Sequence, residues 1–148
     1  MNSFFLCLPQ LLLKPVLTLL FVFTLSSLPA QNNKPADEPF TFESYYKIKW
    51  GYAQEFINLW TANHYPLLKK AMEKGDIISI TAEKPKVHSG EDTRWDFKVT
   101  IVYKNADLAL DHSITDPYKK ELYPDLVKLA KDEQYRFNSI FSVSTSQW

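Results

Sequence analysis

A histidine in the middle of an apolar helical stripe is the residue of this sequence best suited to acid–base chemistry. From 52 to 74 the apolar residues recur with the period of an α-helix, and His64 lies at the centre of the stripe. Burial lowers the pKa of an imidazole and keeps it neutral, so His64 could act as a general base near pH 7 if a pocket opens beside it. The alternative is a core histidine that bonds either the carbonyl group freed by Pro66 or a strand tyrosine.

Several aromatic side chains are spaced so that they could line a cavity for a planar ligand. Trp60 lies one helical turn before His64, and Tyr46 and Trp95 lie in segments that alternate as strands do. Packing in the core explains these residues equally well, so ligand contact by Trp60, Tyr46 and Trp95 is a hypothesis. The other aromatic candidates are Tyr45, Phe97 and Tyr103.

Charged residues alternate around Trp95. Arg94, Asp96 and Lys98 are spaced two apart, which puts their side chains on one face of a strand. We predict that Arg94 and Asp96 contact a polar part of a ligand or pair across a dimer interface. The alternative is a set of ordinary surface ion pairs.

The sequence predicts no metal and no cofactor. Its histidines, His64, His88 and His112, do not stand at the spacings typical of zinc sites. The three glycines are too far apart for a phosphate or dinucleotide loop, and no nucleophile motif is present. Kinase, nucleotide and nicotinamide chemistry are therefore not expected.

The elements that must position these residues follow from the periodicity. The first strand ends before Gly51 and should carry Trp50 on its inner side. Gly75 should end the long helix, and Pro66 should kink that helix near 62–65. In chain order we expect a strand at 40–50, a helix at 52–74, strands at 76–83 and 93–104 joined as a hairpin, a short helical turn within 105–112, a helix start at 116–117, a longer helix after 124 and a strand at 140–146.

This β-α-β-β-α-β order predicts an α+β, ferredoxin-like fold, in which a four-stranded antiparallel sheet carries two helices on one face. The other face of the sheet is left open. A second copy of the chain is the usual cover for such a face, so we expect a homodimer. The side chains expected to point inward from the last helix are Leu126, Val127, Leu129, Ala130 and Tyr135.

The first thirty residues have the pattern of a secretory signal. A base at Lys14 is followed by an apolar run, 16–25, and by small residues that predict cleavage after Ala30. An uncleaved membrane anchor is the alternative, but prolines break the stretch. We therefore predict a signal peptide at 1–30, a flexible tether at 31–39 and one domain at 40–148, secreted or periplasmic, with no stable membrane span after cleavage.

The charge and the cysteine content limit the partners. The sequence has 17 acidic and 17 basic residues, so no strong field draws it to nucleic acid. Its one cysteine, Cys7, lies inside the predicted signal. The exported domain would therefore contain no disulfide and would depend on its hydrophobic core.

The helix around His64 resembles the EthD-like and NIPSNAP-like branch of the dimeric α+β barrel superfamily. The matching residues are Phe56, Trp60, His64, Pro66 and Leu67. The resemblance implies a dimeric α+β barrel in which the histidine faces a pocket. Proteins of this superfamily include cofactor-free oxygenases, isomerases, dehydratases, cyclases and haem-binding enzymes.

The residues and the resemblance together predict an exported homodimer that binds a small apolar or aromatic molecule between helix and sheet. Cofactor-free acid–base chemistry at His64, of the oxygenase, isomerase or dehydratase class, is the finer hypothesis. The alternative is a non-catalytic homodimeric domain that serves as a binding or structural module of the cell envelope.

Overall fold

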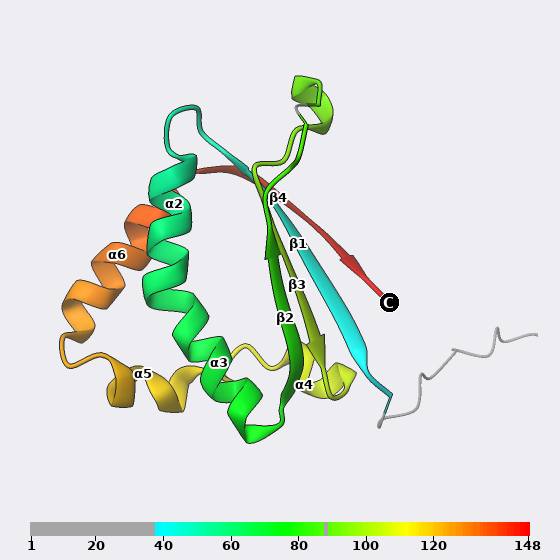
Figure 1. The fold of residues 1–148 in the computed structure, drawn as a ribbon. Coiled ribbons are helices and arrows are strands. Elements are labelled where there is room, and N and C mark those ends of the chain that lie inside the picture. Colours follow the sequence, from blue (N-terminus) through cyan, green and yellow to red (C-terminus); the bar gives the residue numbers. More distant parts are fainter. Residues whose placement is uncertain (1–37, 88) are drawn as a thin grey trace, which may run out of the picture. The chain divides into compact units, whose positions relative to one another are not determined.

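Alternating side chains place the first strand at the centre of a four-stranded sheet. The computed structural model describes residues 38–148 apart from position 88. Strand β1 (Phe40–Ile48) pairs antiparallel with β3 (Phe97–Tyr103) and with β4 (Ile140–Gln147), and β2 (Ile77–Glu83) pairs antiparallel with β3. The strand order is β2-β3-β1-β4, and the long helices lie on one side of the sheet (Figure 1). The predicted α+β, ferredoxin-like fold is confirmed.

The long helix is interrupted where the proline predicts a kink. It comprises α2 (Ala53–Leu59), a π-helical segment (Trp60–His64) and α3 (Tyr65–Lys74). Gly75 ends it with a φ of 85°, in the left-handed region that glycine adopts readily.

Three further helices lie between β3 and β4. These are α4 (Ala106–Leu110), α5 (Asp116–Leu122) and α6 (Leu126–Asn138). The prediction that Leu126, Val127, Ala130 and Tyr135 point inward is wrong, because all four are exposed. The α6 residues that are buried are Leu129 and Arg136, which lie seven positions apart and so share one face of the helix.

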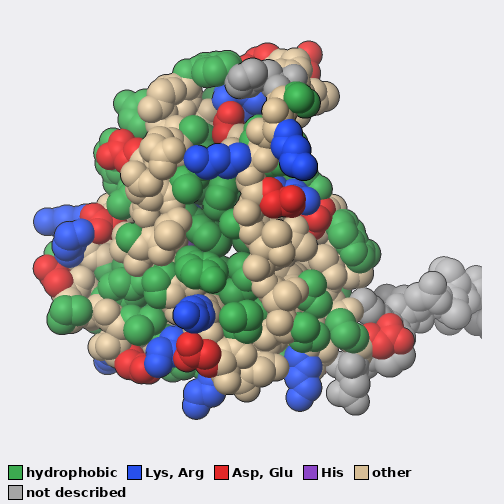
Figure 2. All heavy atoms as spheres, viewed as in Figure 1, with side chains coloured by type: hydrophobic (Ala, Val, Ile, Leu, Met, Phe, Trp, Pro, Cys, Tyr) green, Lys and Arg blue, Asp and Glu red, His purple; other side chains and the backbone are tan. Residues whose placement is uncertain are grey.

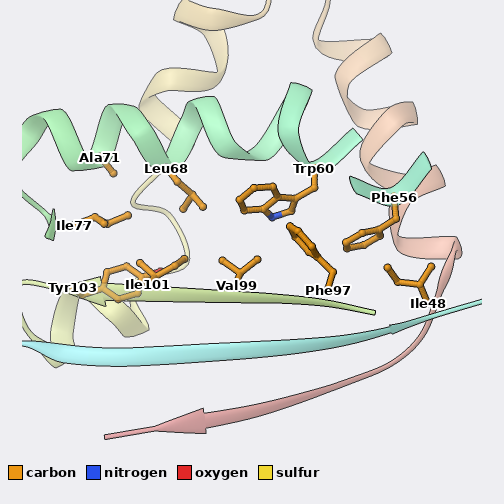
Figure 3. Packing of buried hydrophobic residues seen from close by; sticks show 10 residues of the cluster. All are labelled: Ile48, Phe56, Trp60, Leu68, Ala71, Ile77, Phe97, Val99, Ile101 and Tyr103. Atoms are coloured by element: carbon orange, nitrogen blue, oxygen red, sulfur yellow. The ribbon is translucent and has the colours of Figure 1, made fainter. Parts of the chain in front are cut away.

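The core lies between the long helix and the sheet. Figure 3 shows Phe56 and Trp60 directed from the helix toward side chains of β3. The alternating residues Phe97, Val99 and Ile101 are all buried, as expected for one face of a central strand. The buried cluster comprises Ile48, Phe56, Trp60, Leu68, Ala71, Ile77, Phe97, Val99, Ile101 and Tyr103.

Two strand boundaries differ from the prediction. Strand β1 ends at Ile48, and Trp50 is 73% exposed rather than inward, with the Arg94 guanidinium 4.1 Å from the centroid of its ring. Strand β3 begins at Phe97, four residues after a 3₁₀ turn that ends at Thr93. Arg94, Trp95 and Asp96 therefore precede the strand.

The predicted signal peptide (1–30) and most of the tether (31–39) lie outside the described residues. None of the helices within the described part of the chain has the length and apolar character needed to cross a bilayer.

Candidate functional site

The π-helical segment is a local response to Pro66. The Tyr65 N–H bonds the Trp60 carbonyl five residues earlier, which widens the turn. Pro66 has no N–H to offer the Ala62 carbonyl, and the hydroxyl of Tyr123 lies 3.0 Å from that oxygen instead. The carbonyl freed by the proline is thus bonded by Tyr123, and not by His64 as one interpretation of the sequence proposed.

The wide turn changes which side chain faces the core. Asn63 is buried, with its amide nitrogen 3.4 Å from Asp132, whereas His64 is only partly buried. The regular helical period did not predict that Asn63 would be buried beside His64. The extra residue of a π-helical turn rotates the side chains that follow it about the helix axis. A calculation that assumes a regular α-helical period does not contain this rotation.

The His64 imidazole is neutral at physiological pH. Burial, and then the positive charges of Arg136 and Lys119, lower its pKa from 6.5 to about 4. Its ring centroid lies 6.2 Å from that of Trp60. Within the described part of the chain, the imidazole makes no hydrogen bond.

Arg136 is a buried cation near this histidine. It is 3% exposed, and its Nε atom is fully buried without a hydrogen-bond partner. Desolvation lowers the pKa of its guanidinium. No described carboxylate lies within ion-pairing distance of it. The sequence analysis missed Arg136, although its helical spacing from Leu129 places it on the buried face of α6.

Tyr46 and Trp60 are parts of the core around these two residues. Burial raises the pKa of the Tyr46 phenol, while the charge of Arg136 lowers it. The Tyr46 ring packs 5.1 Å from that of Phe56. Trp60 is buried, with its ring 5.1 Å from Phe97. His64, Tyr46 and Arg136 come from the π-helical segment, β1 and α6, and we call them the interior cluster.

The other predicted ligand contacts lie at the opposite end of α2. Arg94, Trp95 and Asp96 line a hollow of about 300 Å³ whose apolar walls include Ile57 and Pro85. Apolar side chains are visible at the surface between the long helix and β2 in Figure 2. Trp95 also lines a second hollow, of about 400 Å³, on the open side of the sheet. The structure thus brings three predicted residues together, but away from His64, which lines neither hollow.

Arg94 and Asp96 connect the end of β1 to the start of β3. Nη1 of Arg94 lies 2.9 and 2.8 Å from the two carboxylate oxygens of Asp96. The Ile48 N–H donates to Asp96 at 2.7 Å, and Arg94 Nη2 donates to the Ile48 carbonyl at 3.1 Å. Most N–H groups of the Arg94 guanidinium therefore already donate to other residues of the chain.

A carboxylate occupies the middle of the open sheet face. Glu43 is 8% exposed and accepts hydrogen bonds from Tyr45 at 2.5 Å and Thr100 at 3.1 Å. Lys98 lies 3.3 Å from it. The bond from Tyr45 is the main reason why the pKa of Glu43 is lowered. This group is fully partnered, in contrast to the interior cluster.

No group of three or more potential metal ligands occurs among residues 38–148, position 88 apart. His112 lies between α4 and α5. His88 lies outside the described residues.

Comparison with known proteins supports the fold. No family model and no curated protein sequence matches the chain. A dimeric ferredoxin-like protein from an uncultured marine organism matches with a TM-score of 0.53 and 11% identity, over 77% of this chain and 90% of that one. A hydroxynitrile lyase from Passiflora edulis matches with a TM-score of 0.50 and 10% identity, over 76% and 93%.

A NIPSNAP family protein from Agrobacterium tumefaciens also matches, with a TM-score of 0.43 and 13% identity over 75% of this chain and 91% of that one. At these identities the likeness concerns the fold. The class that the architecture defines is the ferredoxin-like α+β fold.

Proposed function

We propose that this chain binds a small apolar or aromatic molecule between the helices and the sheet, at the interior cluster of His64, Tyr46 and Arg136. The observation that carries the proposal is that the side chains of His64 and Arg136 make no hydrogen bond with any described residue, and that the unpaired Nε of Arg136 is buried. Buried polar groups in proteins are nearly always paired, so the buried and unpaired Nε of Arg136 makes this cluster a candidate for ligand binding.

We further propose that the protein acts as an exported homodimer, secreted or periplasmic. The signal pattern at 1–30 supports export. The face of the sheet opposite the helices has no second layer in the described chain, which supports a cover by a second copy (Figure 1). The ferredoxin-like protein from the uncultured marine organism is described as dimeric, and this agrees with the proposal.

The finer proposal is cofactor-free chemistry at His64, of the oxygenase, isomerase or dehydratase class. A general base is most effective when its pKa is near the working pH. With a pKa of about 4, His64 is unprotonated at pH 7 and accepts a hydrogen bond from a substrate, but it takes up a proton only weakly. A negatively charged substrate beside it would raise this pKa and make it a better base. The hydroxynitrile lyase is an enzyme with this fold.

The test is native mass spectrometry of the full-length chain purified without refolding, in search of a small molecule that remains bound. We expect His64→Ala to lose this molecule while circular dichroism stays unchanged. His112→Ala is the matched control, because it removes a histidine that lies outside the cluster, and we expect it to keep the molecule. If both variants kept the bound molecule equally, the proposal that it binds at the interior cluster would be contradicted.

A non-catalytic binding module is the second candidate function. The hollow between α2 and the β2–β3 connection favours it, since this hollow has apolar walls and a polar rim whose main charges, Arg94 and Asp96, already pair with each other. If this hollow is the binding site, Trp95→Ala will lose the bound molecule and His64→Ala will keep it.

A further inference from the structure

The guanidinium of Arg136 lacks an anion. Its Cζ atom lies 4.5 Å from the centroid of the Phe137 ring and 5.6 Å from that of the Phe56 ring. Aromatic faces attract a cation but do not accept its N–H groups as a carboxylate does. Because a buried charge without a partner is costly, buried arginines are normally paired with carboxylates or other acceptors.

The other groups around Arg136 supply no such partner. The Tyr46 phenol stays neutral because burial raises its pKa. The His64 imidazole is neutral above pH of about 4. Glu133 acts on Arg136 through its charge alone, and no ion pair joins them. A negative group that entered this region would therefore meet one cation and no competing anion.

An uncovered apolar area lies next to this cation. Val143 on β4 pairs with Tyr46 on β1, so both side chains lie on the helix side of the sheet. Val143 is nevertheless 44% exposed, and Phe137 on α6 is 55% exposed. The helix layer thus leaves part of β4 free, next to Tyr46, on which the charge of Arg136 acts.

We infer that the ligand of the interior cluster is a small apolar molecule that carries a carboxylate, and that Arg136 binds this carboxylate. The planar fork of a guanidinium fits the two oxygens of a carboxylate, which explains why an arginine suits this position. The apolar part of the ligand lies against Phe137 and Val143. This inference rests on the proposed function, because it names the class of ligand for the same site.

The experiment compares two probes that differ only in charge. 2-Naphthoate and 2-naphthamide are titrated into the full-length protein by calorimetry at pH 7. We expect the carboxylate to bind at least about tenfold more tightly than the amide, as a charge-assisted pair requires. In the same samples, NMR titration of the His64 ring should show that naphthoate raises its pKa by about one unit, whereas naphthamide does not.

A matched pair of variants assigns the effect to one residue. Arg136→Gln should remove the preference for naphthoate. Lys131→Gln makes the same change in net charge at an exposed position of α6 and should keep it. If Arg136→Gln does not fold, the two probes and the His64 titration on the natural protein still decide the question.

Each contrary result has a distinct meaning. Equal binding of the two probes would overturn the inference and leave the proposed binding site standing. Binding of neither probe would overturn both. Acetate that bound as tightly as naphthoate would show a site for simple anions and would contradict the apolar part. A monomer formed by Arg136→Gln in gel filtration would assign the missing carboxylate to a second copy of the chain and would also overturn the inference.

Discussion

The hydroxyl of Tyr123 bonds the Ala62 carbonyl at 3.0 Å, and this is the carbonyl that an N–H at position 66 would bond in a regular α-helix. The same hydroxyl lies 2.9 Å from the Asn63 carbonyl. A residue just after α5 thus completes the backbone hydrogen bonding of the long helix, at the segment that carries His64.

Tyr123→Phe should lower the free energy of unfolding by about 1 kcal/mol, because it removes the hydroxyl that bonds the Ala62 and Asn63 carbonyls. In a Pro66→Ala background the loss should be smaller, since residue 66 then has an N–H of its own. Urea unfolding of the four proteins in this double-mutant cycle measures the coupling. Additive effects would contradict the link between Tyr123 and Pro66.

His64 should make the protein less stable in mild acid. Its folded pKa of about 4 lies below its ordinary value of 6.5, so between these two pH values the unfolded chain binds the proton and the folded chain does not. The free energy of unfolding should fall by about 2 to 3 kcal/mol as the pH is lowered from 6.5 to 4.

His64→Gln tests this pH dependence. Carboxylates with lowered pKa values, such as Glu43, change stability in the same direction, so the informative quantity is the difference between natural and variant protein. That difference should appear below pH 6.5 and be constant above it. His112→Gln is the control, and an equal effect of the two variants would contradict the burial of His64.

The pair of Arg94 and Asp96 should contribute strongly to stability. Arg94→Met leaves the half-buried Asp96 carboxylate with the Ile48 N–H as a partner, and should cost about 2 to 3 kcal/mol. Lys128→Met breaks an exposed ion pair on α6 and should change stability by about 0.5 kcal/mol or less. Chemical unfolding of both variants measures the contrast, and similar losses would show that Arg94 does not connect β1 to β3.

A bulky charged side chain on the open face of the sheet should prevent dimerisation through that face. Ser144 on β4 pairs with Tyr45 and lies on the same side of the sheet as Glu43. Ser144→Arg should convert a dimer into a folded monomer in gel filtration with light scattering. Gln134→Arg, on the exposed surface of α6, should remain dimeric. A natural protein that is monomeric at micromolar concentration would contradict the proposed dimer itself.

The order of the elements was predictable because the apolar residues of this chain follow the periods of strand and helix over most of its length. Gly75 is a good example, since it ends the long helix where the local sequence predicts. The predictions that were wrong concern residues whose positions depend on contacts between distant segments of the chain. Trp50 is exposed because β1 ends at Ile48, and its ring contacts Arg94, far along the chain, which no local pattern predicts.

The candidate site was predictable only in part. His64, Trp60 and Tyr46 were named from the sequence, and their placement relative to Arg136 required the structure. An arginine in a polar helix is normally assigned to the surface, so the buried position of Arg136 could have been found only from its seven-residue spacing to Leu129. The burial of Asn63 was not predicted, because the wide turn alters the helical phase within a few residues.

The wide turn between Trp60 and His64 also determines how this helix can evolve. A π-helical segment holds one residue more than the α-helical turn that it replaces. Losing that residue would rotate the two halves of the helix by about 100° relative to each other. The insertion or deletion of a single codon here therefore changes which side chain of the segment faces the core, while the strands on either side of the helix keep their pairing.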